Sequence, residues 1–172
     1  MARLVALLRG INLGSKRRVA MADLRELLEE LGYEDVRTVL QSGNIVFTGA
    51  KAKARKTLEA ALEERYGFKV DVVLRTMKEL HDIVDAEPFG DEADNLSRYF
   101  VVFLPSAPNA EALDVLKAQD FAPDRFEAGV HELYAWCPQG MQDSGLMRAL
   151  GKPGLAETAT VRNMATVKKL LE

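Results

Sequence analysis

One succession of strands, helices and turns occurs twice in this chain, and that internal repeat restricts its fold more than any other feature. Each half reads as strand, helix, two strands around a glycine turn, helix and strand, followed by a further helix. The turn glycine and the last strand's arginine stand 32 positions apart in the first half (Gly43, Arg75) and 33 apart in the second (Gly129, Arg162). The order βαββαβ is that of the split-βαβ, ferredoxin-like motif. The sequence therefore predicts an α+β fold of two ferredoxin-like units, each with a trailing helix, formed by internal duplication.

The first unit is predicted to span residues 1–86. Its expected elements are strands at 2–9, 36–41, 44–48 and 69–75, and helices at 21–31, at 51–66 and from Thr76 onward. Short unbroken or alternating apolar runs indicate the strands, and apolar residues three and four positions apart indicate the helices. Glu79, three residues after Thr76, predicts a capping box at the start of the third helix.

Residues 87–97 are predicted to form an acidic connector, and residues 98–172 the second unit. Its expected elements are strands at 98–104, 125–128, 131–136 and 157–162, and helices at 109–118, 142–150 and 163–171. An asparagine side chain accepts hydrogen bonds from the first N–H groups of a helix, so Asn163 is expected to cap the last one.

Composition narrows the classes of function. The formal net charge of −3 argues against RNA or DNA binding over the whole surface, although it leaves room for a local basic patch. The single cysteine, Cys137, excludes an intramolecular disulfide, and two histidines offer no metal-binding pattern. No apolar run approaches the ~18 residues of a membrane span. We expect a cytoplasmic protein without a membrane segment, a metal ion or a cofactor.

The loop between the first strand and the first helix is the leading candidate for a binding site. It contains Arg9, Lys16, Arg17 and Arg18 and no acidic residue, and Asn12 lies among them. Backbone N–H groups at a helix start, together with nearby cations, favour phosphate or carboxylate groups. A solvated surface loop explains the same residues about equally well, and the spacing is not that of a P-loop.

The hairpin at residues 41–44 belongs to the same prediction. The first and second strands of a split βαβ unit run parallel, so the basic loop and this hairpin should meet at one end of the sheet. Gln41, Ser42 and Asn44 are hydrogen-bonding groups suited to orienting a ligand that the cations attract. Ordinary turn chemistry is the simpler interpretation of these three residues. Arg162, in the second half, completes the set of candidate ligand-binding residues.

Three phrases of the first half, LLRGINLG (residues 7–14), MADLR (21–25) and VLQSGNIVF (39–47), are long and specific, and Arg162, Asn163 and Thr166 form a shorter one. Through them the chain closely resembles one bacterial family, domain of unknown function 1697. The resemblance implies a bacterial, cytoplasmic α+β protein of compact two-part form. It implies no particular reaction, substrate or cofactor.

Binding of an anionic or phosphorylated small ligand through the first strand-to-helix loop is the function that these residues favour. An acylphosphatase-like hydrolase is an alternative by fold analogy: acylphosphatases use an arginine in the first strand-to-helix loop and an asparagine near the hairpin, and Arg9 and Asn44 are in comparable places, but the glycine-valine-glutamine signature of that family is missing. RNA binding is less favoured, because residues 4–8 of the first strand include no aromatic side chain on which bases would stack. A structural role, including a homodimer paired through free sheet edges, remains open.

Overall fold

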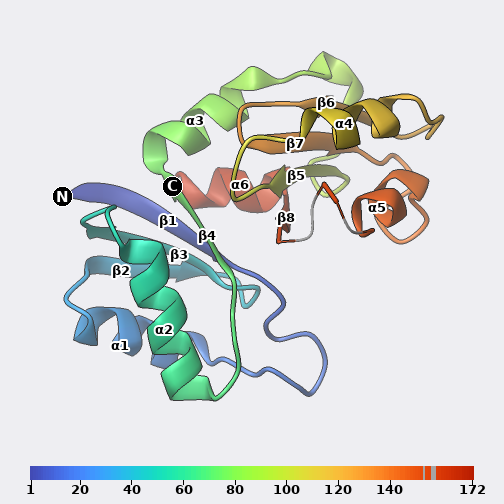
Figure 1. Ribbon diagram of the computed structural model, residues 1–172. Coiled ribbons are helices and arrows are strands. Elements are labelled where there is room, and N and C mark those ends of the chain that lie inside the picture. The colour runs from blue at the N-terminus through green and yellow to red at the C-terminus, as the bar shows by residue number, and fades with distance from the viewer. Residues whose placement is uncertain (153, 156–157) are drawn as a thin grey trace. The chain divides into compact units, whose positions relative to one another are not determined.

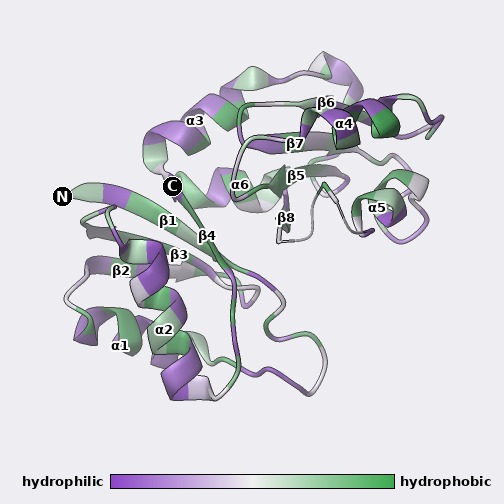
Figure 2. Ribbon diagram, viewed as in Figure 1, coloured by the Kyte–Doolittle hydropathy of each residue, from purple (hydrophilic) through white to green (hydrophobic). Residues whose placement is uncertain are grey.

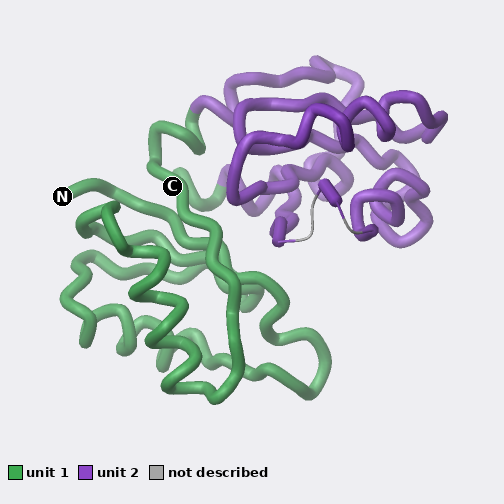
Figure 3. Tube along the Cα trace, in the orientation of Figure 1, with its two compact units in different colours: residues 1–81, 169–172 green, residues 82–168 purple. Residues whose placement is uncertain are grey.

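The computed structural model describes residues 1–152, 154–155 and 158–172. It divides the chain into two compact units, Met1–His81 with Lys169–Glu172 and Asp82–Lys168 (Figure 3). The division falls within the third helix, a few residues before the expected boundary at residue 86, and the last four residues belong to the first unit.

The first unit contains one four-stranded sheet (Figure 1). Its elements, in chain order, are β1 (Ala2–Leu8), α1 (Met21–Glu30), β2 (Glu34–Val39), β3 (Asn44–Gly49), α2 (Ala54–Tyr66) and β4 (Val72–Thr76), after which α3 (Met77–Ala86) begins. The strand order is β2-β3-β1-β4, and all neighbours are antiparallel. Strands β1 and β2 lie on opposite sides of β3, and each pairs with it in the antiparallel direction. They therefore run parallel to each other, which is the ferredoxin-like arrangement.

The alternation of side chains along β1 decides which face the helices cover. Leu4, Ala6 and Leu8 point to the same face and are buried in a cluster with Leu28 of α1 and Leu62 of α2. Figure 2 shows the hydrophobic character of β1 beyond its first residues. The amphipathic helices α1 and α2 therefore pack on one face of this sheet and place the β1–α1 loop at its end.

The second unit repeats this order. Its elements are η1 (Gly90–Glu92), β5 (Tyr99–Phe103), α4 (Ala110–Lys117), β6 (Arg125–Ala128), β7 (Glu132–Trp136), α5 (Gly145–Leu150), β8 (Thr160–Asn163) and α6 (Met164–Leu170). The strand order β6-β7-β5-β8 matches that of the first sheet element by element. The two-unit α+β fold is thus confirmed. The strand predicted at 157–162 starts at Glu157, which lies outside the described residues.

Both predicted helix caps are present. Thr76 N–H donates to Glu79 Oε2 at 2.6 Å, and Glu79 N–H donates to Thr76 Oγ1 at 3.1 Å, which is the reciprocal pattern of a capping box. Asn163 Oδ1 accepts a hydrogen bond from Thr166 N–H at 2.9 Å. In the part of the chain that the structure describes, no helix has the length and apolar character needed to cross a membrane.

Two elements of the first unit start three residues later than the sequence pattern predicts. Helix α2 begins at Ala54 rather than residue 51, because Lys53 before it has a left-handed backbone with φ of 65°. Strand β4 begins at Val72 rather than residue 69, and Lys69 instead offers its carbonyl oxygen to Arg17 of the β1–α1 loop. Both shifts come from turn geometry and from contacts between distant segments, neither of which hydrophobic periodicity reports.

Candidate functional site

The β1–α1 loop and the β2–β3 hairpin meet at one end of the first sheet, as the parallel course of β1 and β2 requires. Leu8 N–H donates to the carbonyl oxygen of Gly43 at 2.8 Å. Asn12 Nδ2 donates to the carbonyl oxygen of Gln41 at 2.7 Å. These contacts tie two segments that stand about thirty residues apart in the chain.

Asn12 organises the loop from within. Its Nδ2 also donates to the carbonyl oxygen of Val19 at 2.9 Å, and its Oδ1 accepts from Val19 N–H at 2.8 Å. Ile11 and Val19, on either side of the loop's exposed tip, are buried in the core cluster of the unit. The loop is therefore anchored by two buried apolar residues and by an asparagine that joins its two arms and the hairpin.

A hollow of about 330 Å³ opens where these segments converge. It is lined by residues from the loop, the start of α1 and the hairpin: Asn12, Arg18, Val19, Ala20, Met21 and Gln41. Ala20 stands at the N-cap position of α1 and makes no side-chain cap, so the first-turn N–H groups add their partial positive charge to that of Arg18. The acidic residue of this turn, Asp23, is engaged by Arg65 and Tyr66 of α2. This combination is suited to an anionic group.

The other basic residues of the loop are placed differently. Arg17 is bound within the unit: Nε donates to the carbonyl oxygen of Gly10 at 2.7 Å, and the guanidinium lies 4.6 Å from the ring centroid of Phe68. Arg9 faces Asp71 across 3.7 Å, and Lys16 is exposed at the loop tip. Arg18 is thus the cation of the loop that lines the hollow.

The hairpin residues also differ in whether they line the hollow or make contacts within the unit. Asn44 is completely buried, and its Nδ2 donates to the carbonyl oxygen of Val39 at 2.7 Å and to Ser42 Oγ at 2.8 Å. These contacts close the hairpin, in agreement with the simpler interpretation of its residues. Gln41 is exposed and lines the hollow. A hydrolase of the acylphosphatase type would need an asparagine that reaches water, and the burial of Asn44 does not support that role.

Arg162 belongs to the second unit. It is buried in β8 and donates to Thr160 Oγ1 at 2.6 Å and to the carbonyl oxygen of Val161 at 2.9 Å. Burial lowers the pKa of Arg162 to about 10. These contacts give Arg162 a place in the packing of its own sheet.

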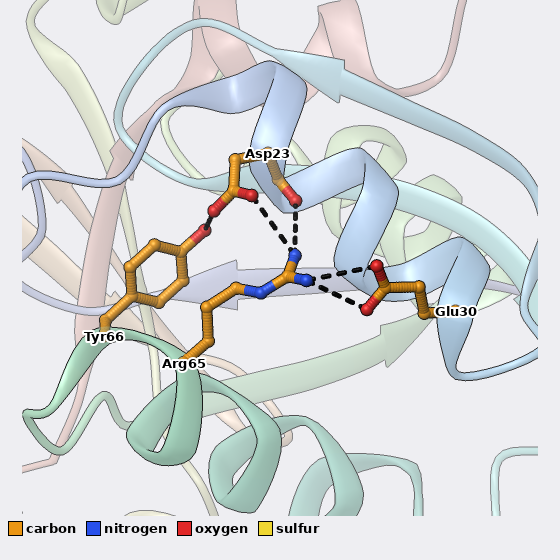
Figure 4. Close-up of polar contacts among 4 residues, drawn as sticks. All are labelled: Asp23, Glu30, Arg65 and Tyr66. Carbon is orange, nitrogen blue, oxygen red and sulfur yellow. Dashed lines mark hydrogen bonds and ion pairs between the residues drawn. The ribbon is translucent and has the colours of Figure 1, made fainter.

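An ion-pair network that the sequence analysis did not identify holds α1 in place (Figure 4). Arg65, in the last turn of α2, donates to Asp23 Oδ1 at 3.2 Å and to Glu30 Oε2 at 2.9 Å. Tyr66 Oη donates to the second carboxylate oxygen of Asp23, and burial and this hydrogen bond raise the pKa of Tyr66. Residues so far apart in the chain give no local signal for pairing; only the packing of α1 beside α2 brings them together.

The prediction for Asn12 follows from its three contacts. Asn12→Ala is expected to destabilise the protein by about 1–3 kcal/mol, because the Val19 amide and two carbonyl oxygens lose their partner. Amide hydrogen exchange should show faster exchange at Val19 N–H, with no change in the second unit. Ser15→Ala, an exposed change in the same loop, is the control. Unchanged protection of Val19 in Asn12→Ala would contradict this role.

Comparisons with known proteins place the chain in a family and identify its fold. No curated protein matches it. The structure of the conserved bacterial protein SP0830 from Streptococcus pneumoniae is similar over 98% of this chain and 96% of that one, with a TM-score of 0.79 and 24% sequence identity, which is a likeness of fold. The family model described as "Protein of unknown function (DUF1697)" matches residues 1–134, a range that includes the whole first unit except its last four residues. The chain therefore belongs to the DUF1697 family of proteins of unknown function.

Proposed function

We propose that this protein binds a small molecule through a phosphate or carboxylate group in the hollow between the β1–α1 loop, the start of α1 and the β2–β3 hairpin. The observation that supports this function is the convergence of Arg18, the uncapped first turn of α1 and Gln41 around one space of about 330 Å³. A guanidinium and free backbone N–H groups bind anionic oxygens, and a neutral amide orients them.

The surroundings of the hollow favour an anion that carries an apolar or aromatic group. Met21 lines the hollow itself. Leu13 and Leu40, which adjoin Asn12 and Gln41 in the chain, are 74% and 52% exposed. A nucleotide or an acyl phosphate would cover such side chains, whereas a bare inorganic ion would leave them in water.

Thermal unfolding with a panel of anions tests this proposal. AMP, ATP, sugar phosphates, carboxylic acids and sulfate are added in turn, and a ligand that binds the folded state raises Tm by mass action. Arg18→Gln should weaken binding of the active ligand about tenfold, since it removes charge-assisted hydrogen bonds. Lys117→Gln, an exposed charge change in the second unit, should bind as the wild type does.

Two results would overturn the proposal. One is a panel in which no anion raises Tm of the wild-type protein. The other is an anion that raises Tm equally in the wild type and in Arg18→Gln, because its binding would then lie elsewhere on the surface.

A further inference from the structure

A second hollow, of about 350 Å³, lies at the far end of the same sheet, where β3 leads into α2. Every residue that lines it is basic: Lys51, Lys53, Arg55 and Lys56. Gly49, at the end of β3, pairs with Ala2 at the start of β1, whereas the first hollow lies beyond the opposite end of β1. The two hollows are therefore separate sites, and nothing about the second depends on the first.

The charges of this hollow are only partly balanced. Lys51 Nζ lies 3.7 Å from Glu79 Oε1, and Arg55 Nη1 lies 3.8 Å from Glu59 Oε1, which are long ion pairs between half-exposed groups. Within the described part of the chain, Lys53 and Lys56 make no ion pair. The four basic side chains of the hollow thus have two carboxylates between them as ion-pair partners, those of Glu79 and Glu59, although the protein as a whole has a net charge of −3. Such an excess of positive charge attracts anions.

The backbone beside the hollow adds to this excess. Lys53 occupies the N-cap position of α2, where its ammonium group has donors only and so accepts no hydrogen bond from the first turn. The first turn of α2 also has no acidic residue. Lysine and arginine are disfavoured at this positive end of a helix, so the local sequence opposes the usual charge preference. Their concentration around an open space is suited to an anionic occupant.

We propose that this hollow binds a diphosphate group, as inorganic pyrophosphate or as the diphosphate of a nucleotide. Two linked phosphoryl groups carry more charge than a single phosphate and present oxygens to several cations at once. The excess positive charge around the hollow matches that chemistry, and its volume lies within the range of small-ligand sites.

Calorimetric titration at low ionic strength tests the proposal with pyrophosphate, ADP, AMP and sulfate. Pyrophosphate should bind the wild-type protein more tightly than AMP or sulfate. The double variant Lys53→Gln/Lys56→Gln should bind it about 10- to 100-fold more weakly. The control Lys117→Gln/Lys168→Gln makes the same charge change with exposed lysines of the second unit, and it should bind as the wild type does. Tighter binding of ADP than of pyrophosphate would identify a nucleotide as the source of the diphosphate, and equal binding would identify the free diphosphate.

Amide chemical shifts locate the bound ion. On addition of pyrophosphate, the largest changes are expected at Arg55, Lys56 and Thr57, in the first turn of α2. Arg18→Gln should leave this binding intact, so the failure of one site does not affect the test of the other. No binding of pyrophosphate to the wild type, equal losses in the two double variants, or binding no tighter than that of sulfate would overturn the proposal.

Discussion

Replacing Gly43 by alanine is expected to lower the free energy of unfolding by about 2–4 kcal/mol, through a steric clash and a backbone penalty. Gly43 has φ of +87°, and an added Cβ would lie 2.8 Å from Leu8 Cβ and 2.9 Å from Ile11 Cδ1. The Leu8 atom is attached directly to the backbone of β1, so relief requires the strand and the hairpin to separate. That movement would also displace Gln41 and widen the first hollow.

Gly14→Ala is the matched control for this change. Gly14 also has a left-handed backbone, with φ of +71°, but no atom lies within 4 Å of the position that its Cβ would take. Gly14→Ala should therefore lower the free energy of unfolding only by the backbone penalty, about 1 kcal/mol. Urea unfolding should show a larger fall in midpoint for Gly43→Ala at an unchanged m-value. Equal destabilisation by the two substitutions would show that the space beside Gly43 is not closely packed.

Raising the pH above 10 is expected to unfold the protein through its tyrosines. The pKa of each of the four is raised, chiefly because burial penalises the phenolate; these residues are Tyr33, Tyr66, Tyr99 and Tyr134. For Tyr99 the pKa rises from 10.0 to about 12, with the charge of Glu87 as the second cause. A pKa that is higher in the folded state gives stability that is complete below pH 10 and is lost as the pH rises through 12. For Tyr99 alone, this amounts to about 3 kcal/mol.

Phenolate absorbance and circular dichroism, followed together, check this expectation. The folded protein should show little phenolate near pH 10, and ionisation should accompany unfolding at higher pH. A tyrosine that titrates with its ordinary pKa while the circular dichroism is unchanged would contradict the assigned burial.

Two phenylalanine variants separate the effect of burying a tyrosine hydroxyl from the effect of its hydrogen bond. Tyr99 Oη is a buried polar atom without a hydrogen-bond partner in the described residues, so Tyr99→Phe should stabilise the protein at neutral pH by about 1 kcal/mol and weaken the alkaline transition. Tyr134 Oη donates to Glu132 Oε1 at 3.0 Å, so Tyr134→Phe should lower stability at neutral pH. If Tyr99→Phe and Tyr134→Phe changed the free energy of unfolding equally, the hydrogen bond from Tyr134 to Glu132 would not account for a difference between the two tyrosines.

The sequence alone was sufficient to predict the internal repeat, the sheet topology and the contact between the β1–α1 loop and the β2–β3 hairpin. The apolar periodicity of strands and helices is local, and handedness leaves a βαββαβ order few ways to form a sheet. The Thr76–Glu79 box and the Asn163 cap were also predictable, because a cap depends on residues within one turn.

The roles of individual polar side chains depended on tertiary packing. Arg9, Arg17 and Arg18 are equivalent in the sequence, yet Arg17 is bound to Lys69 and Phe68, Arg9 faces Asp71, and Arg18 lines the hollow. Whether a charged side chain reaches a partner depends on contacts between segments distant in the chain, and hydrophobic pattern carries no information about them. Topology could therefore be read from the order of residues, whereas only the folded structure selected Arg18, Gln41 and the start of α1 as the walls of one space.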